Sequence, residues 1–296
     1  MKKKVKVVFL VPYYDSDIDG LIDLIDSINY YIKDSYAVVC VNDCKRNESN
    51  RVLKELFESE KLINFVPKYQ PDQSPNAYGS LWCNLFQGVE YSLENLEFNY
   101  LVKMDTDALV TGSELIKKID EYFKQDNALG LIGSYRIRAD GEKRTRWRWA
   151  LYLLYLVYFK KQLSRKSRIW KVCLRKARGN GYRLGESVLG GAYIFSYMCI
   201  NKMIKLYPCY IIKNDKIYLS GIGEDVIFGL LTYASDFKIG DFGRPEDPAA
   251  IAQKYLPISK EDIISFEKQI IHSVNKGNDG ESEEVVRSFF KSYRRK

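Results

Sequence analysis

The chain of 296 residues is 46% hydrophobic and 28% charged, with a formal net charge of +8. This is the composition of an ordinary globular protein that can bury a substantial core, as one large domain or two small ones. Its six cysteines form no C-x-x-C pair and no zinc-type spacing, and the start of the chain turns polar after about seven apolar residues, which is too short for a signal peptide. We therefore expect a cytoplasmic protein with reduced thiols.

Strand and helix patterns alternate over the first 110 residues. In chain order they cover residues 5–11, 21–33, 36–43, 50–60, 62–68, 79–93 and 100–104. Such alternation predicts a mostly parallel α/β sheet flanked by helices. Ligands bind such sheets beyond the carboxyl ends of the strands, so polar residues that follow the strands should converge on one rim.

The pattern changes after a helix at 113–124 and a strand at 129–137. A basic, aromatic segment over about 137–184 interrupts the alternation, which resumes at 186 and continues to a strand at 237–242. The simplest organisation is one domain over 1–275, with a helical insertion at 137–184 and a tail over 276–296 that is polar and then basic.

In the segment NYLVKMDTDALV, a predicted strand is followed by two aspartates one residue apart, Asp105 and Asp107. Both carboxylates can turn toward a divalent cation, and Mg²⁺ or Mn²⁺ prefers such oxygen ligands. The alternative is turn and capping chemistry before the next helix. The pattern alone does not decide between a metal site and a turn, since the same Asp-x-Asp spacing occurs twice in residues 15–19, DSDID.

Two further features bear on this choice. In GIGEDVIFGLL, Glu224 and Asp225 stand where a helix begins; a carboxylate there can act as a general base, or it can simply cap the helix. His272 is the only histidine of the chain. A lone histidine is more often structural, yet a neutral imidazole is a good third metal ligand beside two carboxylates.

These motifs resemble those of a known family. VPYYDS, VNDC, KMDTDALV, VLGGAYIFS, GEDVIFG and IIHSV follow one another as in GT-A-fold, family-2-like glycosyltransferases. The resemblance covers roughly residues 5–275 apart from the basic insertion. It implies a GT-A fold, a nucleotide-sugar donor (typically a UDP-sugar), Mn²⁺ or Mg²⁺, and a glycan or lipid-linked acceptor.

The resemblance also implies roles for the residues of the donor site. Pro12, Tyr13 and Tyr14 would line the nucleotide pocket, and Asp43 would contact the base. Asn84 matches the asparagine of an arginine–asparagine pair that the family often carries, although Cys83 stands where the arginine would be.

The remaining implied roles concern the metal and the reaction. Asp105 would lie near the donor ribose or sugar, Asp107 would bind the metal bridging the diphosphate, and His272 would complete the metal site. The glycines of VLGGAYIFS, Gly190 and Gly191, would let the backbone approach the donor sugar or the acceptor. Asp225, within the Glu224–Asp225 pair, would be the catalytic base of an inverting transfer.

Transfer of a single sugar is favoured over polymerisation, because the Q/R-x-x-R-W motif and transmembrane helices of processive synthases are absent from the sequence. A sugar-nucleotidyltransferase is the nearest alternative, but the loop VPYYDSDIDG lacks the cations that such enzymes use for a triphosphate. A non-catalytic membrane-surface binding protein with the same fold is the other alternative.

The positive charge is concentrated in one segment. Residues 136–178 contain fifteen Lys or Arg and two acids, so they carry +13 and the rest of the chain −5. One interpretation is a helical element on the anionic cytoplasmic face of a membrane, with Trp147, Trp149 and Trp170 near the headgroups. The other is a core helix with a solvated basic face. We expect no nucleic-acid partner, since no DNA- or RNA-binding motif is present.

Overall fold

The computed structural model describes residues 2–42, 55–68, 79–144, 147–154, 168–208 and 222–295. Asp43, one of the predicted site residues, and residues 50–54 of the helix predicted at 50–60 lie outside these ranges.

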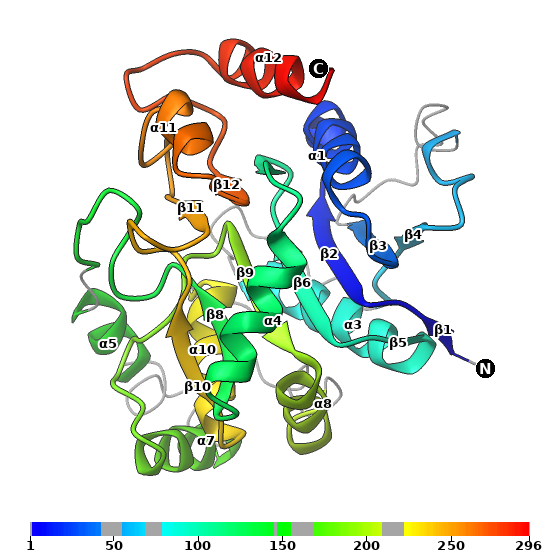
Figure 1. The fold of residues 1–296 in the computed structure, drawn as a ribbon. Helices are drawn as coiled ribbons and strands as arrows, with labels where there is room; N and C mark the ends of the chain where they lie inside the picture. Colours follow the sequence, from blue (N-terminus) through cyan, green and yellow to red (C-terminus); the bar gives the residue numbers. More distant parts are fainter. Residues whose placement is uncertain are drawn as a thin grey trace.

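Within the described residues, a seven-stranded mixed sheet forms the centre of the molecule (Figure 1). Its pairs are parallel except for the two that β9 makes with its neighbours. The strand order is β10 (Lys238–Asp241), β8 (Leu129–Gly133), β9 (Ala192–Ser196), β6 (Tyr100–Met104), β2 (Val7–Tyr13), β3 (Tyr36–Asn42) and β4 (Leu62–Phe65). This confirms the mostly parallel α/β sheet that the sequence predicts.

Helices cover both faces of this sheet, and its central strands are therefore apolar on both sides. All seven residues of β2 are buried, which explains why it reads as a continuous hydrophobic run rather than an alternating one. One face carries α3 (Gly79–Asn95), α7 (Arg168–Gly179), α8 (Tyr197–Leu206) and α10 (Glu224–Ala234); the other carries α1 (Ile18–Tyr31) and α4 (Leu115–Gln125).

A smaller three-stranded sheet lies beside the carboxyl end of β6. It consists of β11 (Ala249–Ile251), β12 (Ile270–His272) and β7 (Ala108–Val110), and it packs with α11 (Lys260–Ser265) and α12 (Glu283–Arg294). The sequence did not predict β7, because its three residues directly follow the aspartates and look like the end of the preceding strand. Two short strands, β1 (Lys3–Lys4) and β5 (Leu96–Glu97), pair near the amino terminus.

The basic segment supplies α5 (Trp147–Leu154) and α7. Trp170 is 2% exposed and packs edge-on against Trp82 of α3, so its predicted place near lipid headgroups is wrong. Helix α7 buries most of its apolar residues beside α10, with Val172 exposed, and it also exposes Arg175 and Arg178, as in a core helix with a solvated basic face. None of the helices in the described part of the chain is long and apolar enough to cross a membrane.

Residues 276–296, expected as a tail, contain the well-defined helix α12. Its Val286 and Phe290 are buried in the same cluster as Leu109 of β7 and Ile271 of β12. The helix lies beside α1 (Figure 1). The carboxy-terminal segment is therefore packed onto the domain assigned to residues 1–275 and shares its core.

Candidate active site

The Asp-x-Asp motif forms the turn between β6 and β7. The backbone N–H of Ala108 donates to the carbonyl of Asp105 at 3.0 Å, which closes this turn. Strand β12 runs antiparallel to β7 and pairs His272 with Ala108. This register brings the imidazole to the aspartates: Nε2 of His272 lies 2.9 Å from Oδ1 of Asp107 and 3.9 Å from Oδ2 of Asp105.

These three side chains fit a divalent metal ion. One ligand atom from each of Asp105, Asp107 and His272 lies within 4.8 Å of the others. The Nδ1 atom of His272 lies 2.5 Å from the carbonyl oxygen of Ala252, which can only accept, so Nδ1 carries a proton and Nε2 faces the carboxylates. Two carboxylates and one imidazole are suitable ligands for a divalent cation.

Polar residues after β12 support the second aspartate. The hydroxyl of Ser273 and the side-chain amide of Asn275 each donate to Oδ2 of Asp107 at 2.7 Å. Such bonds fix the orientation of a ligating carboxylate. These two residues were not identified from the sequence, although the polar residues that follow His272 in IIHSVN could have indicated them.

The protonation of the cluster follows from its contacts. Burial alone would raise the pKa of Asp107, but the hydrogen bond and charge of His272 and the bond from Ser273 lower it to about 2. Burial would lower the pKa of His272, yet the hydrogen bond and charge of Asp107 and the charge of Asp105 raise it. A proton on Nε2 would therefore compete with a cation for this side of the ring.

Lys103 is a buried cation that sequence reasoning missed. Its side chain is 1% exposed, and Nζ lies 2.6 Å from Oδ1 of Asp105, 3.4 Å from Oε1 of Glu224 and 2.5 Å from the carbonyl of Gly190. Burial disfavours the charge, but the charges of Asp105 and Glu224 outweigh it and raise the pKa of Lys103. A lysine within the otherwise apolar strand YLVKM was the available signal.

Glu224 and Asp225 occupy the first turn of α10, as expected, but their surroundings differ. Glu224 faces Lys103, whereas Asp225 accepts a hydrogen bond of 3.2 Å from the hydroxyl of Ser187. Burial and the charge of Glu224 raise the pKa of Asp225 to about 7, against the charge of Arg144 and the Ser187 bond, which lower it. The carboxyl of Asp225 can therefore exchange a proton near neutral pH.

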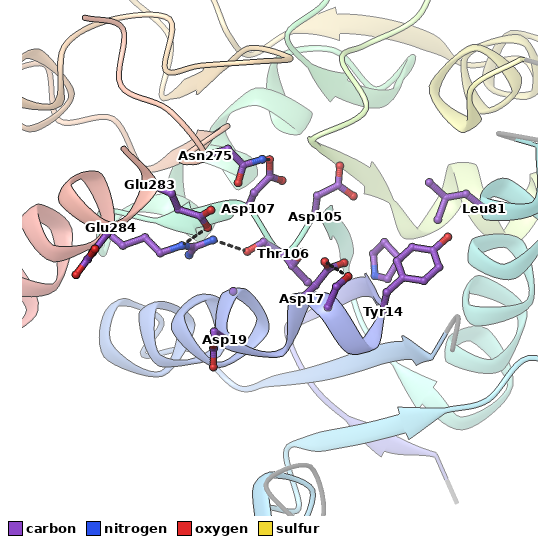
Figure 2. A pocket seen from close by; sticks show the side chains of 14 residues that line it. Tyr14, Asp17, Asp19, Leu81, Asp105, Thr106, Asp107, Asn275, Glu283 and Glu284 are labelled. Carbon is purple, nitrogen blue, oxygen red and sulfur yellow. Dashed lines mark hydrogen bonds and ion pairs between the residues drawn. The ribbon is translucent and has the colours of Figure 1, made fainter. Parts of the chain in front are cut away.

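An open cleft of about 790 Å³ lies over the turn between β6 and β7. Figure 2 shows Tyr14 and Leu81 on one side, Glu283 and Glu284 of α12 on the other, and Asp105 and Asp107 between them. This volume is within the range of small-molecule sites. Pro12 and Tyr14, which the resemblance assigns to the nucleotide pocket, line this cleft. The cleft lies at the carboxyl edge of β2 and β6, where the sheet topology predicts a ligand.

Two predicted pocket residues lie elsewhere. Tyr13 is fully buried, and its hydroxyl donates to Oδ1 of Asn64 at 3.0 Å. Side chains alternate along a strand, so Tyr13 points away from the cleft that its neighbours Pro12 and Tyr14 line. Asn84 is fully buried in α3, and Leu81 of the same helix lines the cleft.

The two glycines before β9 make room for protein side chains. A Cβ atom on Gly191 would lie 2.1 Å from Nδ1 of His272, and one on Gly190 would lie 2.7 Å from Oε1 of Glu224. The carbonyl of Gly191 also accepts a bond from the N–H of Asp105 at 2.9 Å. Both glycines thus allow the approach of His272 and Glu224, a reason for small residues that the sequence did not indicate.

No protein-family model and no curated protein matches the chain. Among solved structures, it is similar to TarS 1–349 of S. aureus, with 14% identity and a TM-score of 0.44 over 80% of this chain and 58% of that one. It is also similar to WbbM, described as a bifunctional glycosyltransferase, with 12% identity and a TM-score of 0.48 over 94% of this chain and 46% of that one. The chain spans about half the length of these structures.

Proposed function

We propose that this chain is a GT-A-fold glycosyltransferase. In this proposal it transfers a single sugar from a nucleotide-sugar donor, a UDP-sugar, to a glycan or lipid-linked acceptor, with Mn²⁺ or Mg²⁺ as cofactor. The observation that carries the proposal is the group of Asp105, Asp107 and His272 at the carboxyl edge of a mostly parallel sheet, where the two aspartates line a cleft large enough for a nucleotide.

The charge of the cleft supports metal-dependent binding of the donor. Among the described residues that line it, Arg287 is the one cationic side chain, and it is already paired with Glu283 at 2.7 Å. The acidic lining residues are Asp17, Asp19, Asp105, Asp107, Glu283 and Glu284. A diphosphate in this field would be repelled unless a cation bridged it to the carboxylates. Asp105, Asp107 and His272 are the residues that would hold this cation.

A bound divalent cation would neutralise charge on the departing nucleoside diphosphate. The residues of the chain supply the other requirements. Lys103 keeps Asp105 and Glu224 in place and balances their charge. The side chains of Ser273 and Asn275 hold Asp107 in one orientation.

Asp225 is the proposed general base. Its carboxylate would take the proton of an acceptor hydroxyl as the hydroxyl oxygen forms a bond to the anomeric carbon. The bond from that carbon to the diphosphate oxygen would break with inversion, and its electron pair would leave with the nucleoside diphosphate. The raised pKa of Asp225, about 7, supports this role because a base with this pKa is partly deprotonated at neutral pH and still basic enough to accept the proton.

We also propose that the exposed basic face of α7 contacts an anionic surface such as the cytoplasmic leaflet of a membrane. Arg175 and Arg178 are exposed, and Val172 between the basic positions is 53% exposed. A lipid-linked acceptor would be presented at such a surface.

The test is release of nucleoside diphosphate from a panel of UDP- and GDP-sugars, with and without added acceptor glycans. We expect release that requires Mn²⁺ or Mg²⁺ and stops when the metal is chelated. Folded protein that releases no nucleoside diphosphate from any donor, and binds none of them, would contradict the proposal.

A further inference from the structure

Three elements meet behind the Asp-x-Asp turn, and one side chain joins them. Arg287 of α12 donates from Nη2 to the carbonyl oxygen of Thr106 at 3.2 Å, as a dashed line in Figure 2 marks. Thr106 is the residue between Asp105 and Asp107. The same guanidinium donates from Nη1 to Oδ2 of Asp23 on α1 at 2.9 Å. Arg287 thus connects the carboxy-terminal helix, the first helix and the peptide between the two aspartates.

Helix α12 has a second arginine on the same buried carboxylate. Asp23 is 1% exposed, and Arg294 binds its Oδ1 atom and, at 2.9 Å, its backbone carbonyl. Arg287 is also held by Glu283 at 2.7 Å. Both arginines therefore attach α12 to α1. Of the two, only Arg287 also has a hydrogen bond to the turn.

The contact between α1 and the turn is close enough to require a glycine. A Cβ atom on Gly20 of α1 would lie 2.9 Å from the carbonyl oxygen of Thr106 and 3.1 Å from Nη2 of Arg287. The first distance is to backbone, so a side chain at this position would displace the turn. Gly20 and Arg287 thus hold the Thr106 peptide from two sides.

We infer that Arg287 is a positioning residue of the metal site and that α12 acts on the site through it. The inference rests on the metal site of the proposed function. The orientation of the Thr106 peptide determines how the side chains of Asp105 and Asp107 leave the backbone. A guanidinium bound to this carbonyl and to a buried carboxylate keeps both ligands at one spacing. Residues that orient metal ligands in this way typically contribute about 10- to 100-fold to metal affinity.

A matched pair of variants tests this role. Arg287→Met and Arg294→Met each remove one guanidinium from Asp23 and leave the other in place. We expect similar losses of thermal stability for both. Calorimetric titration with Mn²⁺ alone should show at least about tenfold weaker binding for Arg287→Met, and binding within about twofold of the unsubstituted chain for Arg294→Met.

Gly20→Ala provides a second test that leaves both arginines intact. Alanine is favoured over glycine within a helix by about 1 kcal/mol, so this change does not weaken α1 by helix propensity. Its methyl group would push against the Thr106 carbonyl. We expect weaker Mn²⁺ binding from this variant too, and it remains informative if Arg287→Met does not fold.

The outcomes separate this inference from the proposed function. If the unsubstituted chain binds no Mn²⁺, the metal site of the proposed function fails. If it binds Mn²⁺ and the Arg287→Met variant binds it equally well, the positioning role alone is wrong. Equal weakening by Arg287→Met and Arg294→Met would also overturn it, because the loss would then follow from the attachment of α12. Loss of UDP binding with unchanged Mn²⁺ affinity would make Arg287 a nucleotide contact instead.

Discussion

The turn between β6 and β7 and the start of α10 both present partly buried carboxylates, yet their protonation differs. At the turn, contacts with His272 and Ser273 lower the pKa of Asp107 to about 2. At the start of α10, burial and the charge of Glu224 raise the pKa of Asp225 to about 7. Burial raises the pKa at both sites, so the neighbouring side chains decide the direction of the net shift.

This difference separates two kinds of chemistry. A carboxylate that stays ionised at every physiological pH, beside a second carboxylate and an imidazole, suits a metal ligand. A carboxyl group that titrates near neutrality suits proton transfer. Lys103 lies between the two sites, with Nζ 2.6 Å from Asp105 and 3.4 Å from Glu224. Its positive charge balances the negative charges of these two carboxylates.

The largest effect is expected at the metal site. Asp107→Ala removes one of the three proposed ligands and the acceptor of the Ser273 and Asn275 bonds. We expect Mn²⁺-dependent UDP binding to weaken by more than about 100-fold in calorimetry, because loss of a ligand should exceed the effect of losing a residue that only orients one. Asp17→Ala is the control, since Asp17 lines the cleft outside the cluster. An equal loss in both variants would mean that general cleft charge, and not the cluster, binds the nucleotide.

Substitution at the other site should affect the rate and spare binding. Asp225→Asn keeps the shape of the side chain but cannot accept the proton. We expect the transfer rate to fall by about 10²- to 10⁴-fold with nucleotide affinity unchanged, which steady-state kinetics and calorimetry measure together. If the nucleotide affinity of Asp225→Asn falls as far as that of Asp107→Ala, the assignment of separate roles is wrong.

The pH dependence sharpens the contrast. With a pKa of about 7, Asp225 is protonated below neutrality, so kcat/KM should decrease about tenfold per pH unit below 7 and level off above it. The hydroxyl of Ser187 donates to the carboxylate of Asp225 and stabilises its charged form. Ser187→Ala should therefore shift the midpoint upward, by up to about one pH unit. A midpoint that stays in place would exclude Asp225 as the group observed.

The smallest effect is expected on the basic face of α7. Arg175→Glu with Arg178→Glu should weaken co-sedimentation with phosphatidylserine vesicles, because each basic residue near an anionic surface contributes about 1 kcal/mol. The matched control is Lys117→Glu with Lys124→Glu on α4, which changes the charge by the same amount. Equal effects of the two pairs would leave net charge, and not this face, as the cause.

The sequence predicted the central sheet and the strand-end position of Asp105 and Asp107 because strand patterns and strand-end polar residues are local signals. The place of His272 beside them was implied by the family resemblance. It missed β7, whose pairing with β12 is a contact between residues far apart in the chain. That pairing brings His272 to the aspartates, so the cluster was expected but the strand that assembles it was not. Lys103 was missed because its role depends on Glu224, 121 residues away.

The errors have physical causes as well. Tyr13 was assigned to the pocket with Pro12 and Tyr14, but alternation along β2 turns it into the core. One of the two interpretations of the basic segment placed Trp170 at a membrane because of the basic residues around it, whereas its ring packs beside Trp82. In both cases the neighbouring residues indicated whether the segment is polar or apolar. The surroundings of the single side chain depend on the direction in which it points, which the neighbouring residues do not show.

The measurement that tests the central claim most directly is a calorimetric titration of the protein with UDP, GDP and their sugars, first with Mn²⁺ and then after chelation. The account predicts that UDP species bind in the presence of Mn²⁺ and that binding disappears when the metal is removed. Binding of the same strength without metal, or no binding of any nucleotide by folded protein, would contradict it.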